Sequence, residues 1–110
     1  MSKIITSPVK KYPGTVTLAD PLTFPQAFAF EDALKRVREL RGTNDLSRMR
    51  YALLEGVIPC VEEWHLENFP EQVSLETFPS TPRLPIVKLI DWLVEEVSTL
   101  YEVSEDVPLA

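Results

Sequence analysis

The segment over residues 82–101 constrains the fold more strongly than any other part of the chain. Its apolar side chains recur at spacings of three and four, which is the period of an α-helix. Pro82 and Pro85 are tolerated in a first helical turn, and Ser80 or Thr81 is the expected N-cap. Because the apolar arc is wide, the helix must contact more than one neighbour, and we expect it to be the central helix of the core. The arc consists of Ile86, Val87, Leu89, Ile90, Leu93, Val94, Val97, Leu100 and Tyr101.

A second amphipathic segment predicts a helix over residues 25–41. Thr23 and Gln26 have the spacing of a capping box, and Gly42 supplies a C-terminal stop. Charged side chains occupy the face opposite the apolar one, as expected for a helix that packs on a core. The apolar face consists of Ala27, Phe30, Ala33, Leu34, Val37 and Leu40.

The segment that follows predicts either one kinked helix or two short helices, over residues 45–55 and 58–66. Gly56 and Pro59 interrupt the pattern, because proline lacks the backbone amide that a helix interior requires. The candidates for the N-cap are Thr43, Asn44 and Asp45. The apolar positions that continue at helical spacing beyond the interruption are Val57, Cys60, Val61 and Trp64.

The remaining segments are predicted to lack long regular elements. Residues 1–22 predict an extended arm with at most a short β-hairpin around Pro13-Gly14. Residues 67–81 are predicted to form an irregular crossover, and residues 102–110 an acidic tail that frays. We therefore expect an all-α fold, a small bundle of three to five helices in one domain, whose helical body covers residues 23–101.

Charge divides unevenly along the chain. The 110 residues carry 11 Lys and Arg and 17 Asp and Glu, for a net charge of −6. Nine basic and five acidic side chains give residues 1–50 a charge of +4, whereas two basic and twelve acidic ones give residues 51–110 a charge of −10. Either the halves attract each other within one fold, or the basic face of one copy meets the acidic face of the next. The acidic balance disfavours nucleic-acid binding.

Composition and motifs also argue against several classes of protein. One cysteine excludes an internal disulfide, no apolar run reaches the roughly 20 residues that span a bilayer, and the N-terminus lacks an apolar signal region. Cys60 and His65 lie close in sequence beside Glu62 and Glu63, but Cys60 belongs to an apolar repeat and no second cysteine or histidine completes a site. We therefore expect a non-enzyme with no catalytic residues, cofactor or metal, which does not bind a membrane.

Two aromatic residues lie outside the apolar faces of their helices. Phe28 falls among charged residues of the first helix, and Trp92 falls among polar residues of the last. Exposed aromatic side chains are enriched at interface hot spots. The alternative is that the N-terminal arm or the crossover covers them, and the interface hypothesis gains if both are exposed.

Several short motifs resemble those of tail assembly chaperones of long-tailed, siphovirus-like bacteriophages. The resemblance lies in Pro13-Gly14-Thr15-Val16 and in the stretch from Asp20 to Gln26, which match the "Pro-Gly-x-Val … Asp-Pro-Leu-Thr-x-Pro-Gln" arm of that group. Further similar segments are Val61-Glu62-Glu63-Trp64 with Phe69-Pro70, Ile90-Asp91-Trp92-Leu93 with Tyr101, and Val107-Pro108.

The resemblance implies a small helical protein that binds the phage tape measure protein during tail assembly in the host cytoplasm. Such proteins keep the tape measure protein soluble, help to recruit tail tube protein, and have no catalytic residues. Repeated weak contacts by several copies of the chain would suit this task, so we expect a homo-oligomer. The residues predicted to bind the partner are Phe28, Lys35, Arg36, Arg38, Trp92, Glu95 and Glu96.

Two other functions stay open from the sequence. One is a structural virion component, such as a head–tail connector or a tail-completion subunit, which would remain in purified particles. The other is a small acidic regulator of a host protein, although 11 basic residues offset the 17 acidic ones and weaken this interpretation.

Overall fold

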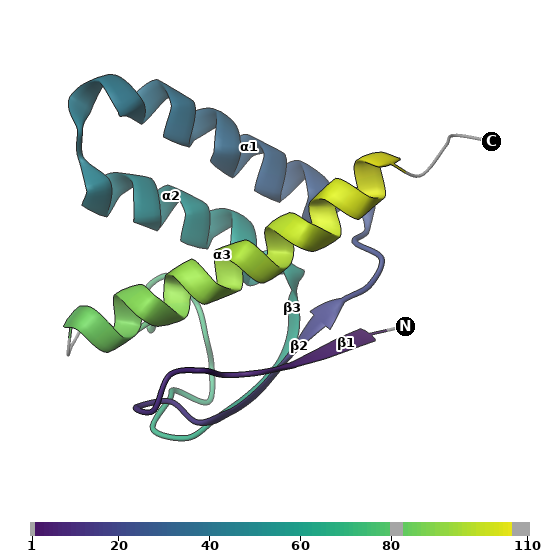
Figure 1. The fold of residues 1–110 in the computed structure, drawn as a ribbon, viewed down its shortest axis with the longest axis vertical. Coiled ribbons are helices and arrows are strands. Elements are labelled where there is room, and N and C mark those ends of the chain that lie inside the picture. Colours follow the sequence, from purple (N-terminus) through teal and green to yellow (C-terminus); the bar gives the residue numbers. More distant parts are fainter. Residues whose placement is uncertain (1, 80–82, 107–110) are drawn as a thin grey trace.

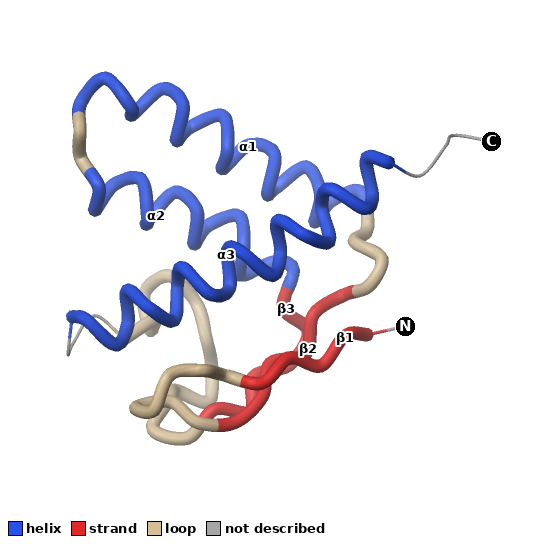
Figure 2. The backbone as a smooth tube through the Cα atoms, viewed as in Figure 1, coloured by secondary structure: helices blue, strands red, loops and turns tan. Residues whose placement is uncertain are grey.

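The computed structural model describes residues 2–79 and 83–106, and it contains both a sheet and helices (Figure 1). Three antiparallel strands form one layer, and three α-helices pack beside it (Figure 2). In chain order the elements are β1 (Ser2–Thr6), β2 (Gly14–Ala19), α1 (Phe24–Leu40), the 3₁₀ turn η1 (Arg41–Thr43), α2 (Leu46–Val57), the 3₁₀ turn η2 (Ile58–Cys60), β3 (Val61–Leu66) and α3 (Arg83–Asp106).

The predicted all-α fold is wrong, because the chain folds as α+β. The short β-hairpin that the sequence allowed within residues 1–22 is present as β1 and β2. The expected helix over residues 58–66 is wrong, since this segment forms η2 followed by β3, which pairs with β2. The three strands pair in the order β1-β2-β3, with Ile5 opposite Val16 and Val16 opposite Trp64. An isolated hairpin is marginal in water, so β3 and the helices supply the contacts that make the sheet stable.

A bulge in the sheet explains why β3 resembled a helix in sequence. Leu18 pairs with Val61 and Thr17 pairs with Glu63, so Glu62 is an extra residue in β3. The bulge leaves both Val61 and Trp64 half-buried against the core, although they lie three residues apart. Three is also a helical spacing, and the sequence pattern therefore predicted the wrong element.

The predicted helices over residues 25–41 and 45–55 are confirmed as α1 and α2. The capping box is also confirmed, since the amide of Thr23 donates to Oε1 of Gln26 (2.8 Å) and the amide of Gln26 donates to Oγ1 of Thr23 (3.4 Å). Nε2 of Gln26 donates in addition to the carbonyl oxygen of Pro59 (3.1 Å). This third bond ties the start of α1 to the turn that leads into β3.

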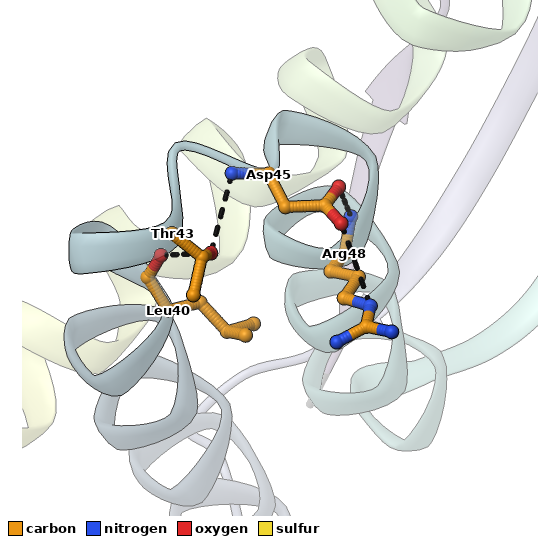
Figure 3. A network of polar contacts seen from close by, with 4 residues as sticks. All are labelled: Leu40, Thr43, Asp45 and Arg48. Atoms are coloured by element: carbon orange, nitrogen blue, oxygen red, sulfur yellow. Dashed lines mark hydrogen bonds and ion pairs between the residues drawn. The ribbon is translucent and has the colours of Figure 1, made fainter.

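The turn between α1 and α2 does not depend on Gly42, which was the predicted stop. Gly42 lies inside η1, and Asn44 adopts the left-handed conformation with a φ of 54°. Among the three candidate caps the structure uses Asp45, whose carboxylate accepts from the amide of Arg48 (3.1 Å) (Figure 3). Thr43 donates to the carbonyl of Leu40 (2.6 Å) and accepts from the amide of Asp45 (3.3 Å), which fixes the turn.

Helix α3 is central to the core, as predicted. Its side chains Ile86, Leu89, Leu93, Val97 and Leu100 are buried. Ion pairs tie it to both neighbouring layers: Lys3 of β1 to Glu96 (3.5 Å), and Arg50 of α2 to Asp91 (3.5 Å). The expected caps Ser80 and Thr81, together with Pro82, lie outside the described residues. The helix continues to Asp106, so residues 102–106 of the predicted tail are helical, and residues 107–110 lie outside the description.

An aromatic cluster holds the long loop after β3 against the sheet. Trp64 stacks on Phe69 with ring centroids 5.3 Å apart, and Phe69 meets Tyr12 and Phe78 edge to face, at 5.5 Å in each case. The loop predicted as an irregular crossover therefore packs through its own aromatic side chains. Phe78 reaches the start of α3, where it helps to form a pocket described below.

Candidate functional site

The most exposed aromatic side chains of the described chain lie together at the start of α1. Phe24 and Phe28 are 74% and 59% exposed, and their rings stack with centroids 6.0 Å apart. Their spacing of four residues puts both rings on the face of α1 opposite Phe30, which is fully buried. The position of Phe28 outside the apolar face of α1 indicated that ring from the sequence, but Phe24 was not predicted, although the i, i+4 spacing of two aromatic residues could have indicated the pair.

The three predicted basic residues do not form one patch. Lys35 is exposed and lies on the face of α1 that carries Phe28, seven residues further along the helix. Arg36 points to α2 instead, where its guanidinium forms an ion pair with Glu55. Arg38 is exposed beside the groove between α1 and α3, which Tyr101 and Glu102 also line. Only Lys35 is therefore placed to act with the phenylalanine pair.

The predicted residues of α3 also differ in their surroundings. Trp92 is half-buried and packs against the core, so only one of the two predicted aromatics is largely exposed. Glu96 forms its ion pair with Lys3, one turn from Trp92, which shows that this side of α3 faces β1. The side chain of Glu95 is exposed. Trp92 and Glu96, one turn apart, thus lie on the side of α3 near β1, whereas Phe28 lies on the face of α1 opposite the buried Phe30.

An apolar pocket lies between α2, α3 and the end of the aromatic loop. Its volume is about 260 Å³, and Leu54, Phe78 and Ile90 contribute apolar walls. Tyr51, 52% exposed, and Arg50, held by Asp91, stand among the residues that line it. No pattern in the sequence indicates this pocket, because its walls come from three segments that are distant along the chain.

The structure separates Cys60 and His65, the two side chains considered for nucleophilic or metal chemistry. Cys60 is fully buried in η2, and its thiol donates to the carbonyl oxygen of Gly56 (3.5 Å). His65 is exposed on β3, with Nε2 2.9 Å from Oε2 of Glu63. Over residues 2–79 and 83–106, no three metal-ligating side chains gather into a cluster. Burial raises the pKa of the Cys60 thiol from 9.0 to about 11, which keeps the sulfur protonated near neutral pH.

The raised pKa predicts how stability depends on pH. The unfolded thiol ionises near pH 9 and the folded thiol near 11, so the contribution of a neutral Cys60 is complete below pH 9 and is lost as the pH rises from 9 to 11. Wild-type and Cys60→Ala proteins should therefore differ less in their free energy of unfolding at pH 11 than at pH 8. Urea denaturation across this range measures the difference, and a gap that does not change with pH would contradict the prediction.

Neither a membrane-spanning helix nor a similar known protein indicates a function for the described chain. None of the helices in the described ranges combines the length and the apolar character needed to cross a membrane. The comparisons with protein families, curated proteins and solved structures found no match to this chain.

Proposed function

We propose that this chain is a non-catalytic assembly chaperone that binds a long helical protein with exposed apolar surface, the tape measure protein of a bacteriophage tail. The proposal joins the resemblance of the N-terminal and middle motifs to that group of chaperones with the surface described above. The observation that carries it is the stacked, exposed pair of Phe24 and Phe28. Exposing large aromatic rings to water is unfavourable in free energy, and a binding partner that covers the rings removes this penalty.

The surroundings of the pair suit an amphipathic helical partner. Lys35 lies on the same face of α1 as the two phenylalanine rings. Glu31 and Asp32 lie between Phe28 and Lys35 along the helix, and all three charged side chains are exposed. A partner helix could place apolar side chains on the phenylalanine rings and charged side chains beside these residues. The rings are also firmly placed, because the capping box and the bond from Gln26 to Pro59 fix the first turn of α1.

The apolar pocket beside α2 offers a second contact for the same kind of partner. Its volume of about 260 Å³ is of the size that one or two large apolar side chains fill. Two separate apolar contacts on one copy, repeated over several copies, would hold an extended helical protein by avidity. Tight binding by one site is then unnecessary.

Co-expression with the tape measure protein of a long-tailed bacteriophage tests the proposal. We expect the wild-type chain to make that protein soluble and to co-purify with it. The double variant Phe24→Ala/Phe28→Ala should lose most of the solubilised partner while keeping its own fold, because both rings are exposed. The readouts are the soluble fraction of the partner and the thermal midpoint of the variant.

Leu46→Ala provides the matched control, since Leu46 is 61% exposed on a different helix. It removes a similar apolar side chain and should leave the soluble fraction unchanged. Equal solubilisation by the wild-type and double-variant chains would remove the aromatic pair from the binding site. A wild-type chain that stays in purified virus particles would instead support a structural virion component.

A further inference from the structure

Strand β1 forms an edge of the sheet, and no strand of the described chain lies beyond it. The other outer strand, β3, is interrupted by the bulge at Glu62, a feature that blunts a sheet edge. β1 has no such interruption, since all of its residues pair with β2 in one continuous register. It therefore presents a row of main-chain amides and carbonyls that another strand can use.

A hydrogen bond just beyond β1 shows which of its residues direct their main-chain groups outward. The amide of Ser7 donates to the carbonyl oxygen of Gly14 (2.9 Å), which is the residue directly opposite when the β1–β2 register is continued. Hydrogen-bonded and non-hydrogen-bonded positions alternate in an antiparallel pair, so Lys3 and Ile5 bond to β2. The residues whose main-chain groups point away from β2 are Ser2, Ile4 and Thr6.

The pairing of β2 with β3 gives the same alternation. The amide of Glu67 donates to the carbonyl oxygen of Pro13 (2.8 Å), so the odd-numbered residues of β2 bond to β3. The even-numbered residues of β2 are then left to bond to β1, and among them Val16 lies opposite Ile5. Both strand pairs therefore assign the same outward residues to β1.

The side chains of β1 leave this edge open to a second strand. Ile4 is 68% exposed, and Ser2 and Thr6 on either side of it are exposed as well. A charged side chain on an edge strand commonly deters pairing. Lys3 is the only charged residue of β1, and it reaches α3 instead, where it forms an ion pair with Glu96 (3.5 Å). No charge therefore stands among the outward residues.

We infer that β1 of one copy pairs antiparallel with β1 of a second copy, about a two-fold axis at Ile4. Ile4 then lies opposite its own counterpart, and Ser2 of each copy lies opposite Thr6 of the other. Every outward residue meets an outward residue, so each opposite pair can exchange main-chain hydrogen bonds. The two isoleucine side chains cover each other, and the flanking hydroxyls can hydrogen-bond across the strands.

The sequence of the edge favours a second copy over an unrelated extended peptide. A small hydroxyl residue stands on each side of a branched apolar one, so the edge is complementary to itself. The hydroxyl of Ser2 donates to the carboxylate of Glu62 (3.1 Å) and can still accept a hydrogen bond. The contact is the same on both copies and closes as a dimer with one continuous sheet. The inference goes beyond the proposed function, since it requires only copies of this chain.

Sedimentation velocity of the full chain tests the inference. We expect a dimer at about 50 mM NaCl that persists at about 500 mM, because main-chain hydrogen bonds and apolar contact are not screened as paired charges are. Ile4→Lys and Ile4→Glu should each weaken the dimer by about tenfold at low salt. Both lose the apolar contact and place like charges opposite each other across the axis.

An equimolar mixture of the Ile4→Lys and Ile4→Glu chains shows whether position 4 meets itself. Opposite charges then face each other across the axis, so the mixture should associate more strongly than either variant alone. Two misfolded variants could not give this result. Leu46→Glu is the matched control, because Leu46 is 61% exposed on α2, and this variant should dimerise like the wild type.

Cross-linking measures the register. Ile4→Cys places two thiols opposite each other at a Cα separation of about 5.5 Å, which suits a disulfide. Oxidised glutathione should therefore give a covalent dimer. Two Thr6→Cys thiols would lie about 13 Å apart along the strands and should cross-link poorly, whereas a mixture of Thr6→Cys and Ser2→Cys chains should cross-link well. Cys60 is fully buried, so the wild-type chain is the unreactive control.

Several outcomes would overturn the inference. A wild-type chain that is monomeric at both salt concentrations would do so, as would a mixture that stays monomeric or Thr6→Cys chains that cross-link as well as Ile4→Cys chains. Association that disappears at high salt would indicate pairing of charged faces instead.

These results can be told apart from failure of the proposed function. A monomeric wild-type chain that still solubilises the helical partner would refute the copy-to-copy contact alone. If Ile4→Lys then reduced the solubilised partner, the edge of β1 would belong to an extended segment of that partner and not to a second copy.

Discussion

Replacing Phe30 with alanine should lower the free energy of unfolding by about 3–5 kcal/mol. The side chain is completely buried, and its ring lies 5.5 Å from that of Tyr101, so it joins α1 to the C-terminal part of α3. Truncation removes this apolar contact and leaves a cavity that the surrounding helices can fill only in part. Urea denaturation followed by circular dichroism measures the loss.

Phe28→Ala is the matched control on the same helix. Phe28 lies two residues earlier and is 59% exposed, so the same substitution should change stability by less than about 1 kcal/mol. Comparing the Phe30→Ala and Phe28→Ala variants therefore separates a phenylalanine that stabilises the fold from one that is proposed to bind a partner. Similar losses for the two variants would mean that Phe28 is packed in solution and would remove it from the proposed binding surface.

Gly56→Ala should destabilise the protein by about 1–3 kcal/mol, although alanine is the better helix former. A Cβ atom at Gly56 would lie 2.5 Å from Cβ of Ala33 and 3.0 Å from the carbonyl oxygen of Ala29. Helix α2 would have to move away from α1, and this movement would disturb the core contacts of Leu54 and Val57. The change in the urea midpoint measures the effect.

Two further variants separate crowding from helix propensity. Ala33→Gly in the Gly56→Ala background removes the atom that meets the new methyl group and should recover part of the loss. Gly42→Ala adds a methyl group where no atom lies within 4 Å, so it should be neutral or stabilise by up to about 1 kcal/mol. A Gly56→Ala protein as stable as the wild type would show that the two helices separate at little cost.

Local sequence patterns predicted α1, α2 and α3 and allowed a short β-hairpin within residues 1–22, but they did not predict β3 or the three-stranded sheet. The spacing of Ile86, Leu89 and Leu93 and the pair of Thr23 and Gln26 depend on neighbours within one or two turns, and both were confirmed. The pairing of Val16 with Trp64 spans 48 residues and a helical hairpin, and no local period encodes it. The bulge at Glu62 further replaced the alternation of a strand by a spacing that also fits a helix.

The same distinction between local sequence and tertiary packing applies to the candidate sites. The position of Phe28 outside the apolar face of α1 indicated an exposed ring, and the ring is exposed. Sequence periodicity could not place Lys10 and Lys11 beside Lys88, because the groove that these three lysines line is formed by the loop between β1 and β2 and by the distant helix α3. It also could not show that Glu55 would engage Arg36, since this ion pair depends on how α1 and α2 cross.

The position of the α1–α2 hairpin between β2 and β3 has a consequence for the order of folding. A growing chain makes β1 and β2 first, yet the middle strand keeps one open edge until both helices have closed and brought residues 61–66 alongside. Helix α3, which is synthesised after these elements, then packs its buried apolar side chains into the same core. Much of the core therefore forms late, and nascent chains that end before α3 should depend on cellular folding factors.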